Sequence, residues 1–596
     1  MNFAKNQTER SMKAISAARA ARNEWSTSKN FSWNSFYRIV AASVKVTNES
    51  RKFYVWLESR IAKDEDRALY EKVAVEQAVL AEELSQDKLY RKKLWTWTRS
   101  ESFKKLSDDQ KMCVKVDLAT TETSKLPKYK RDRLLELSAK QEELESQFNK
   151  NLKRDEELFG VHVKKLGTLK VLPKSIRQAA RLKALSVGWG GWLFDVSNTN
   201  YKAFIKNTTI DPEIKSTMIK ERMKVGIIGS GMDSNKDVLA KISEVRREEA
   251  VLNGKSNYGK YAWATNVLST PQKMKNFLNR VEQDVTSSEI KIDAKIKEQY
   301  ASLSCAASKG KAALFELWNK WFNIEVEIVK PLSWLPDTER FFLKKDGLGI
   351  GYVSLDLYAR SSKSELDGPF MVDLTARHEM THGVIKLPES FVSMNSKKVW
   401  RHDDVLTFFH EMGHVLHHLS CDSDLDAVGY SAIEADAMEW PSMFMQEWGW
   451  DSEVVESVFG KDAVKICKAV KHFETTEVLK FGVGLATMDM EMHCGKNKSS
   501  DDPIKWFGAV QRTSASASKL MKNDWARWGH LSMMRGTYAG YLYGQRLAVC
   551  MHKKLHNADK EKWDTLWEKV FQKGGRAYSV AALNEWSPGI CKRAIG

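Results

Sequence analysis

The stretch from Asp403 to Leu419 constrains the fold most, because it contains a His-Glu-x-x-His motif whose chemistry depends on helical geometry. Residues four apart lie on one face of an α-helix, so the imidazoles of His410 and His414 can converge on one metal ion. Glu411 lies about 100° further round the helix, where it can reach a water at that metal without ligating it. Apolar residues recur every three or four positions and predict a buried helix over residues 403–419.

The same motif occurs a second time, at residues 378–382, so the two copies must be distinguished on physical grounds. Zinc needs a third protein ligand. His418 lies on the same face as His410, but a rise of about 1.5 Å per residue places it roughly 12 Å further along the helix. The third ligand must therefore come from another element of the chain.

Glu439 is the predicted third ligand. It lies 25 residues beyond His414, within a helical pattern over residues 431–442, and this distance allows a return helix to bring its carboxylate alongside. We therefore expect one zinc ion per chain, held by His410, His414 and Glu439. Two nearby carboxylates, at positions 434 and 436, could accept the second ring N–H of a metal-bound His, or else face solvent.

The first copy of the motif lacks this context. A step of 25 residues from His382 reaches Thr407, which is not a metal ligand. Gly383 and the short apolar runs around it favour strands on either side of a turn. We therefore interpret the copy at residues 378–382 as a match without a metal.

Two segments of this chain resemble the zinc site of the thimet oligopeptidase family. This family includes neurolysin, oligopeptidase A and the dipeptidyl carboxypeptidases. These segments are Phe409-His-Glu-Met-Gly-His-Val-Leu-His417 and Glu434-Ala-Asp436-Ala-Met-Glu439-Trp-Pro-Ser442. Further segments that resemble the family are Phe148-x-x-Asn151-Leu152, Arg246 to Gly254 with Tyr258, and Gly351 to Arg360 with Lys363. The resemblance extends from about residue 130 to the end, whereas the first 130 residues match only in helical character.

The resemblance implies a mostly α-helical metallopeptidase of two lobes around a deep central groove, with a small β-sheet edging the active site. Residues 1–340 would form much of the groove wall, and residues 341–596 would form the catalytic region. Short apolar alternation with several Gly over residues 345–395 also favours a small sheet there. In the family a strand of this kind edges the groove, where an extended peptide could pair with its backbone.

The resemblance also implies the chemistry, which is zinc-dependent hydrolysis of internal or near-C-terminal bonds in short unfolded peptides, with Glu411 as general base. In the family a His begins a Gly- and Tyr-rich loop and two Tyr three residues apart end it. His530, Tyr538 and Tyr541 keep this order, and Gly540 keeps its place between the two Tyr. By resemblance, Tyr541 stabilises the oxyanion with support from His530, while Tyr538 and Gly540 contact the substrate.

Composition limits the partners of the chain. The net charge is +17, but Lys residues are spread along the chain and interleaved with acidic residues, which favours a solvated basic surface over nucleic-acid binding. No run of 18 apolar residues appears, so we expect no membrane span. Seven scattered Cys without a Cys-x-x-Cys pair are typical of cytosolic thiols. We expect a cytoplasmic monomer that acts on short peptides.

Several alternatives stay open. The Arg, Ser and Ala bias of residues 11–22 fits either a first surface helix or an organellar transit peptide, which would place the chain in mitochondria or another organelle lumen. The activity could be that of a dipeptidyl carboxypeptidase or an organellar processing peptidase. Two alternatives belong to other functional classes. An inactive scaffold would lack a metal ligand or the general base, but all four of these residues are present. The hypothesis of a nucleic-acid-binding protein is supported only by the net charge.

Overall fold

The computed structural model describes residues 3–595 apart from 30, 208, 288–290, 364–367, 376–378, 382–383, 423–424, 426–432, 496–501, 514–522 and 575–578. Helices dominate these residues, as predicted. The chain forms two compact units: unit 1 comprises Met1–Ala139, Trp263–Gly482 and Ala539–Gly596, and unit 2 comprises Lys140–Ala262 and Val483–Tyr538. The groove, and the functional division of the chain near residue 340, stay predictions.

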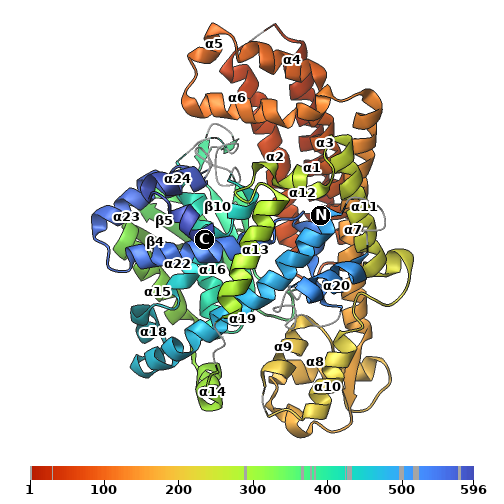
Figure 1. The fold of residues 1–596 in the computed structure, drawn as a ribbon, viewed down its shortest axis with the longest axis vertical. Helices are drawn as coiled ribbons and strands as arrows, with labels where there is room; N and C mark the ends of the chain where they lie inside the picture. Colours follow the sequence, from red (N-terminus) through yellow and green to blue (C-terminus); the bar gives the residue numbers. More distant parts are fainter. Residues whose placement is uncertain are drawn as a thin grey trace. The chain divides into compact units, whose positions relative to one another are not determined.

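The N-terminal part of unit 1 is a set of long helices, shown in red and orange in Figure 1. They are α1 (Phe3–Thr27), α2 (Trp33–Glu58), α3 (Asp64–Ser85), α4 (Lys88–Trp97), α5 (Glu101–Lys104) and α6 (Asp108–Thr120). Helix α1 packs against both α2 and α3. Only 11 Pro occur in the whole chain, so few positions interrupt such helices. None of the described helices is long and apolar enough to cross a membrane.

The predicted small sheet is present in unit 1. Its strands are β4 (Ile324–Val329), β5 (Glu339–Lys345), β6 (Leu348–Tyr358), β7 (Phe370–Thr375) and β10 (Glu389–Ser396), in the order β4-β5-β6-β10-β7. Strands β6 and β10 are parallel, and the other pairs are antiparallel. The family-like strand is β6, which lies inside the sheet. In the described part of this sheet, the outer strands β4 and β7, and not β6, present an unpaired backbone edge.

The first copy of the motif is not helical where the structure describes it. Strand β8 (Glu379–Thr381) pairs with β9 (Val384–Lys386) as an antiparallel two-stranded sheet. This confirms the prediction of strands around a turn. His378, His382 and Gly383 themselves lie outside the described residues.

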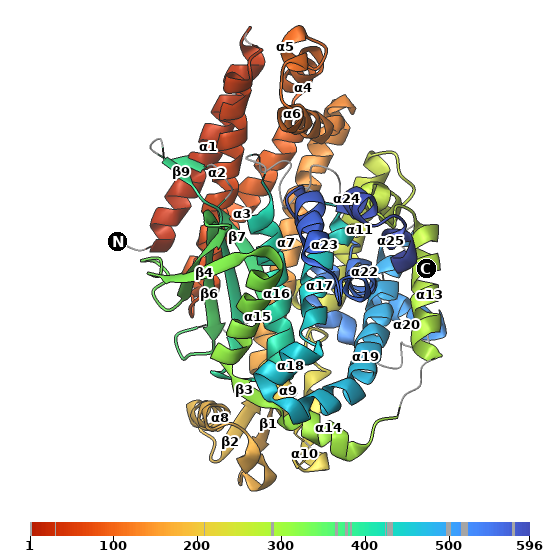
Figure 2. The ribbon, with the colours of Figure 1, turned by 90° about the vertical axis from the view of Figure 1, so that its left-hand side faces the viewer.

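The remaining helices of unit 1 come from distant parts of the chain (Figure 2). They are α13 (Pro271–Thr286), α14 (Ala294–Ser302), α15 (Ala307–Phe322), α16 (His402–Ser420), α17 (Trp440–Trp448), α18 (Ser452–Phe459), α19 (Lys461–Cys494), α22 (Ala539–Leu555), α23 (Lys560–Leu566), α24 (Ser579–Trp586) and α25 (Ile590–Ile595). A short pair, β3 (Ser304–Ala306) and β11 (Val399–Arg401), leads into α16. Helix α16 packs on β6, β7 and β10 and also on α17, and α17 packs on α22.

Unit 2 is also mainly helical. Its elements are most of α7 (Lys128–Leu158), the end of α19, β1 (Gly160–Val163), α8 (Lys174–Ser186), β2 (Trp192–Asp195), α9 (Asn198–Lys206), α10 (Pro212–Arg222), α11 (Asn235–Leu252), α12 (Tyr258–Ala262), α20 (Pro503–Thr513) and α21 (Gly529–Met533). Asp211 caps α10 by accepting the N–H of Glu213 at 2.8 Å.

Candidate metal centre

Helix α16 presents the predicted His pair from a buried position. The ring centroids of His410 and His414 lie 5.3 Å apart. The apolar residues of the predicted stripe are 0 % exposed, which fixes the rotation of the helix about its axis. These residues are Val405, Phe408, Phe409, Met412, Val415, Leu416 and Leu419. Both imidazoles therefore point toward one side of α16, as the spacing predicts.

Glu439 completes the cluster. Its Oε2 lies 3.3 Å from Nε2 of His410 and 3.3 Å from Nε2 of His414. Four donors at ~2.0–2.1 Å around a tetrahedral zinc are roughly 3.3 Å from each other, so these separations fit the ion. Two imidazoles and one carboxylate are also a zinc donor set that leaves one position for water. The residues therefore fit zinc as the bound metal.

The local structure around Glu439 differs from the predicted continuous helix. A short 3₁₀ turn (Ala435–Ala437) precedes it, and Glu439 is the N-cap residue of α17, with Pro441 in the first turn. Proline is well tolerated there because its missing N–H has no partner inside the helix. Pro441 therefore starts this helix, and the expectation that residues 431–442 form one helix is wrong for the described residues 433–439.

A glycine permits the close approach of the two metal-ligating segments. A Cβ at Gly413 on α16 would lie 2.4 Å from the carbonyl oxygen of Pro441 and 2.7 Å from Cα of Ser442. Because no side chain separates the helices, Glu439 can come within reach of both imidazoles. Sequence reasoning missed this role, although Gly413 stands inside the motif itself.

Two neighbours orient the ligands. His410 donates from Nδ1 to Oε1 of Gln446 at 3.0 Å, which leaves the Nε2 lone pair for the metal. The buried hydroxyl of Ser442 donates to Oε2 of Glu439 at 2.9 Å. Neither residue was identified from the sequence. A Gln about two helical turns after the ligand Glu is too common a pattern to signal this role.

Asp436, a predicted acceptor for a ligand His, has a different environment. It is fully buried, and its two carboxylate oxygens accept the backbone N–H groups of Val267 and Leu268 at 3.0 and 2.8 Å. It therefore holds the segment before α13, and the alternative of a surface carboxylate is wrong. Glu434 is half-buried at the start of the 3₁₀ turn.

The electrostatics of the cluster favour positive charge on the imidazole of His410. Burial acts to lower the pKa of His410, but contact with Glu439 and Glu411 raises it above its usual value. Burial acts to raise the pKa of Glu439, yet the two imidazoles hold it well below its ordinary range. A metal ion competes with protons for these positions, so metal uptake weakens as the pH falls.

Glu411 is buried beside the three ligands. Burial raises the pKa of its carboxyl, while His410 and His414 oppose the rise. A carboxylate whose pKa is raised binds a proton from water more readily, which is the property of a general base.

Tyr541 and Gly540 lie on α22, in the same unit as the metal cluster. Tyr541 is half-buried in the first turn. Gly540 lies in the first turn of the helix, and its contact with substrate stays a prediction. A Cβ there would lie 3.0 Å from the backbone of Asp436, and one at Gly544 would lie 2.9 Å from the carbonyl carbon of Glu439. These two glycines let α22 pack against the backbone that carries Glu439.

His530 and Tyr538 lie together in unit 2. His530 is part of the short helix α21, and its ring meets that of Tyr538 edge to face with centroids 5.6 Å apart. The turn between α21 and α22 contains Arg535 and Gly536 at positive φ. The backbone N–H of Tyr538 donates to Oδ2 of Asp489 at 3.1 Å. The roles of His530 and Tyr538 stay predictions.

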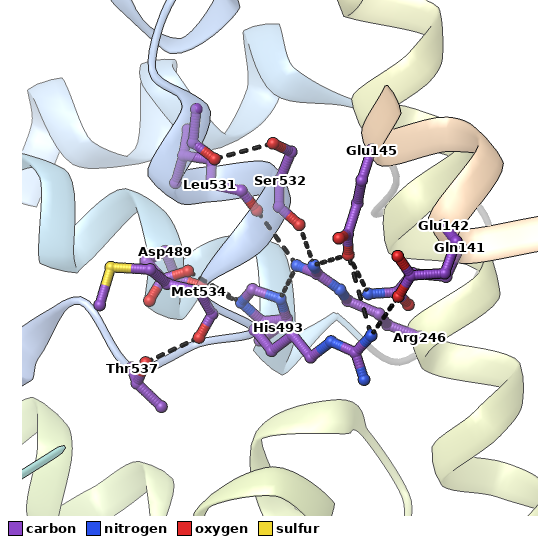
Figure 3. A network of polar contacts seen from close by, with 12 residues as sticks. Gln141, Glu142, Glu145, Arg246, Asp489, His493, Leu531, Ser532, Met534 and Thr537 are labelled. Atoms are coloured by element: carbon purple, nitrogen blue, oxygen red, sulfur yellow. Dashed lines mark hydrogen bonds and ion pairs between the residues drawn. The ribbon is translucent and has the colours of Figure 1, made fainter. Parts of the chain in front are cut away.

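A buried arginine holds the segment that carries His530 (Figure 3). Arg246 of α11 is fully buried and donates to the carbonyl oxygens of Leu531, at 3.1 Å, and Ser532. It also donates to Nε2 of His493 at 2.9 Å and forms an ion pair with Glu145 at 3.5 Å. Because its partners come from α21, α19 and α7, this one guanidinium fixes α21 against α11 and α19.

The remaining imidazole of the predicted face is not a ligand. His418 contacts Ser390 of β10 through Nδ1 at 2.8 Å, so it joins α16 to the sheet. This contact agrees with the length argument, by which His418 lies too far along the helix to share an ion with His410.

The similarity of this chain to known proteins shows which family it belongs to. The model of peptidase family M3 matches residues 289–587, which is just over half of the chain and includes the whole metal cluster. The chain belongs to peptidase family M3. This confirms the resemblance to thimet oligopeptidases, and peptide hydrolysis is the activity that the family name describes.

Curated relatives and solved structures agree with this membership. Oligopeptidase A of Haemophilus influenzae is 24% identical over 521 residues, covering 78% of this chain and 76% of the relative. Dipeptidyl carboxypeptidase of Escherichia coli is 22% identical over 380 residues, covering 56% and 54%. The structure of PZ peptidase A with inhibitor 2 aligns with a TM-score of 0.61 at 12% identity, covering 100% and 96%. The similarity to PZ peptidase A shows that this chain and that structure share one α-rich fold.

Proposed function

We propose that this M3 peptidase is a zinc-dependent oligopeptidase that hydrolyses internal or near-C-terminal bonds in short unfolded peptides. The observation that supports it best is the approach of two Nε2 atoms to one oxygen of Glu439, each at 3.3 Å, beside the buried Glu411. Bound there, zinc would polarise the peptide carbonyl and lower the pKa of a water to ~7.

The protein groups around the ion have distinct tasks. Glu411 takes the proton of the attacking water and later carries it to the leaving amine. Gln446 and Ser442 keep the ligands His410 and Glu439 in the orientation that leaves one position open. Tyr541, with His530 in support, donates to the carbonyl oxygen as negative charge develops on it.

The metal-site assignment can be tested by elemental analysis. We expect one zinc per chain to survive dialysis in the wild-type protein and to be lost in His414→Ala, because two remaining ligands cannot hold the ion tightly. His382→Ala, in the other copy of the motif, is the matched control and should keep its zinc. If His382→Ala lost its zinc and His414→Ala kept it, the metal would be bound by the copy at residues 378–382, and our assignment would be wrong.

Tyr541→Phe should lower kcat by roughly 10²–10³, the cost of removing one oxyanion donor, with little change in KM. Tyr538→Phe should act more on KM, because its hydroxyl is expected to contact the substrate equally in the ground state and the transition state. Steady-state kinetics of both variants on one short peptide separate these effects. A kcat for Tyr541→Phe within a few-fold of wild type would remove Tyr541 from the mechanism.

The bond that is cut distinguishes an oligopeptidase from a dipeptidyl carboxypeptidase or an organellar processing peptidase. Mass spectrometry of products from a mixed library of short peptides, with and without a chelator, reports it directly. Cleavage at internal bonds supports the proposal, whereas exclusive release of C-terminal dipeptides supports the carboxypeptidase.

We also propose a cytoplasmic monomer without nucleic-acid or membrane partners. The seven Cys all lie in the described part of the chain, where none of them forms a disulfide, and five of them are buried, which suits a reducing compartment. The molar mass of the purified protein, measured by light scattering, tests whether it is a monomer. Salt-dependent retention of an oligonucleotide on a filter would contradict the absence of a nucleic-acid partner.

A further inference from the structure

A second pair of His residues at helical spacing ends α22. His552 lies in the last turn of the helix, and His556 follows four residues later. The backbone N–H of His556 donates to the carbonyl oxygen of His552 at 2.8 Å, so the helical turn continues to His556. Their ring centroids lie 5.3 Å apart, the same separation as for His410 and His414. The pair therefore has the spacing by which two imidazoles on one helix share a metal ion.

Asp451, the N-cap residue of α18, faces this pair. Its Oδ2 lies 3.1 Å from Nδ1 of His556 and 3.8 Å from Nε2 of His552. All three donor atoms lie within 4.8 Å of one another. The distance expected between two ligand atoms of a tetrahedral zinc is roughly 3.3 Å, which lies between these two separations. Small side-chain rotations would therefore bring the three donor atoms to one ion.

The two oxygens of Asp451 have separate tasks. Oδ1 caps α18 by accepting the N–H of Glu453 at 2.9 Å, which leaves Oδ2 for the imidazoles. The cap therefore fixes the carboxylate in position, with Oδ2 on the side of the two imidazoles.

The environment of His552 also suits a cation. Its Nε2 is buried and makes no hydrogen bond within the described part of the chain. The indole of Trp448 covers the ring, with centroids 4.3 Å apart. A buried ring nitrogen without a hydrogen bond is costly unless it binds something. His556 has half of its side chain exposed, at 50%, so an ion can enter from solvent.

We propose that His552, His556 and Asp451 bind a second divalent transition-metal ion, Zn²⁺ by donor type, with water completing the coordination. The C-terminal end of α22 adds the partial negative charge of the helix dipole. Of the neighbouring cations on this helix, Lys554 donates to Ser587 at 2.8 Å and lies over the ring of Trp586 at 4.9 Å, and Lys553 is exposed.

The position of this site argues for a structural ion. Helices α17 and α22 run alongside each other, because Gly544 meets Glu439 near their starts and His552 meets Trp448 at the other end. The step of eight residues from Gly544, which meets Glu439, to His552 separates the second site from the level of Glu439 by roughly 12 Å along α22. That is far beyond the ~4 Å between ions in a two-metal active site. The ion would join α22 to the segment after α17, and it does not depend on the proposed peptidase mechanism.

Zinc titration of the holoprotein tests this site. By calorimetry and elemental analysis, wild type should bind one more Zn²⁺ than His556→Ala, and added Zn²⁺ should raise the Tm of wild type but not of the variant. Asp451→Asn should also lose the extra ion while keeping the α18 cap, because an amide oxygen still accepts the N–H of Glu453. His472→Ala removes an exposed imidazole on α19 and should bind like wild type. Ca²⁺ and Mg²⁺, which prefer oxygen ligands, should not substitute.

The test depends on the difference in the number of bound zinc ions between wild type and His556→Ala. This difference does not depend on the occupancy of the site formed by His410, His414 and Glu439. Equal counts in these two proteins, or equal Tm responses, would overturn the site and leave Asp451 and His556 as an ion pair only. Peptide hydrolysis by His556→Ala holoprotein should match wild type. A loss of kcat in this variant without a loss of zinc would also overturn the structural role.

Discussion

Glu411→Gln is expected to keep the zinc and abolish peptide turnover. The amide preserves the size of the side chain but cannot accept a proton from water. General-base catalysis contributes ~10²–10⁴ in rate, so kcat should fall by at least this factor. Because Glu411 is not a ligand, His410, His414 and Glu439 should hold the ion as in wild type. Activity and zinc content, measured on the same preparation, check both parts.

The other copy of the motif supplies a matched control for this experiment. Glu379→Gln makes the same chemical change in the other copy of the motif, where the described backbone is strand β8 and not a helix. It should leave both turnover and zinc unchanged. Substantial activity in Glu411→Gln would show that another group accepts the proton, and a loss of zinc would show that Glu411 holds the ion.

The metal helix and its partner could be predicted because their signals are local. The apolar stripe of residues 403–419 specifies a buried helix, and the four-residue spacing of its His pair follows from helix geometry alone. Glu439 followed from the length of chain needed to return to that helix. The strand interpretation of residues 379–386 rested on local turn residues, and the structure confirms it.

The contacts that fix the geometry could not be predicted, because they depend on how close two backbones come. Nothing in the sequence shows that Gly413 faces Pro441 or that Gly544 faces Glu439. Gln446 and Asp451 are polar residues in ordinary helical contexts, and only the fold shows which imidazoles they meet. Asp436 looked like a partner of the metal because it is near Glu439 in sequence, yet its carboxylate binds backbone N–H groups of a distant segment.

Gly413→Ala is expected to weaken zinc binding strongly and to destabilise the fold, although a helix normally prefers Ala. The added Cβ would lie 2.4 Å from the carbonyl oxygen of Pro441, and backbone cannot rotate away as a side chain can. Helix α17 must therefore shift, and Glu439 at its N-cap shifts with it. Overpacking of this kind costs ~1–3 kcal/mol, and a displacement of about 1 Å in a catalytic group costs ~10²-fold in rate.

Gly508→Ala separates this steric effect from helix propensity. Gly508 lies in α20, where a Cβ would meet only the flexible end of Arg512 at 3.4 Å. Removing the backbone freedom of a helical glycine there should stabilise the protein by ~0.5–1 kcal/mol and leave zinc and turnover unchanged. If contact at residue 413 positions Glu439, denaturant unfolding should show changes of opposite sign in the two variants, and zinc content and kcat should fall only in Gly413→Ala. If Gly413→Ala were as stable and as active as Gly508→Ala, α17 would have room to move without displacing the ligand, and the geometry of the metal centre would not depend on this glycine.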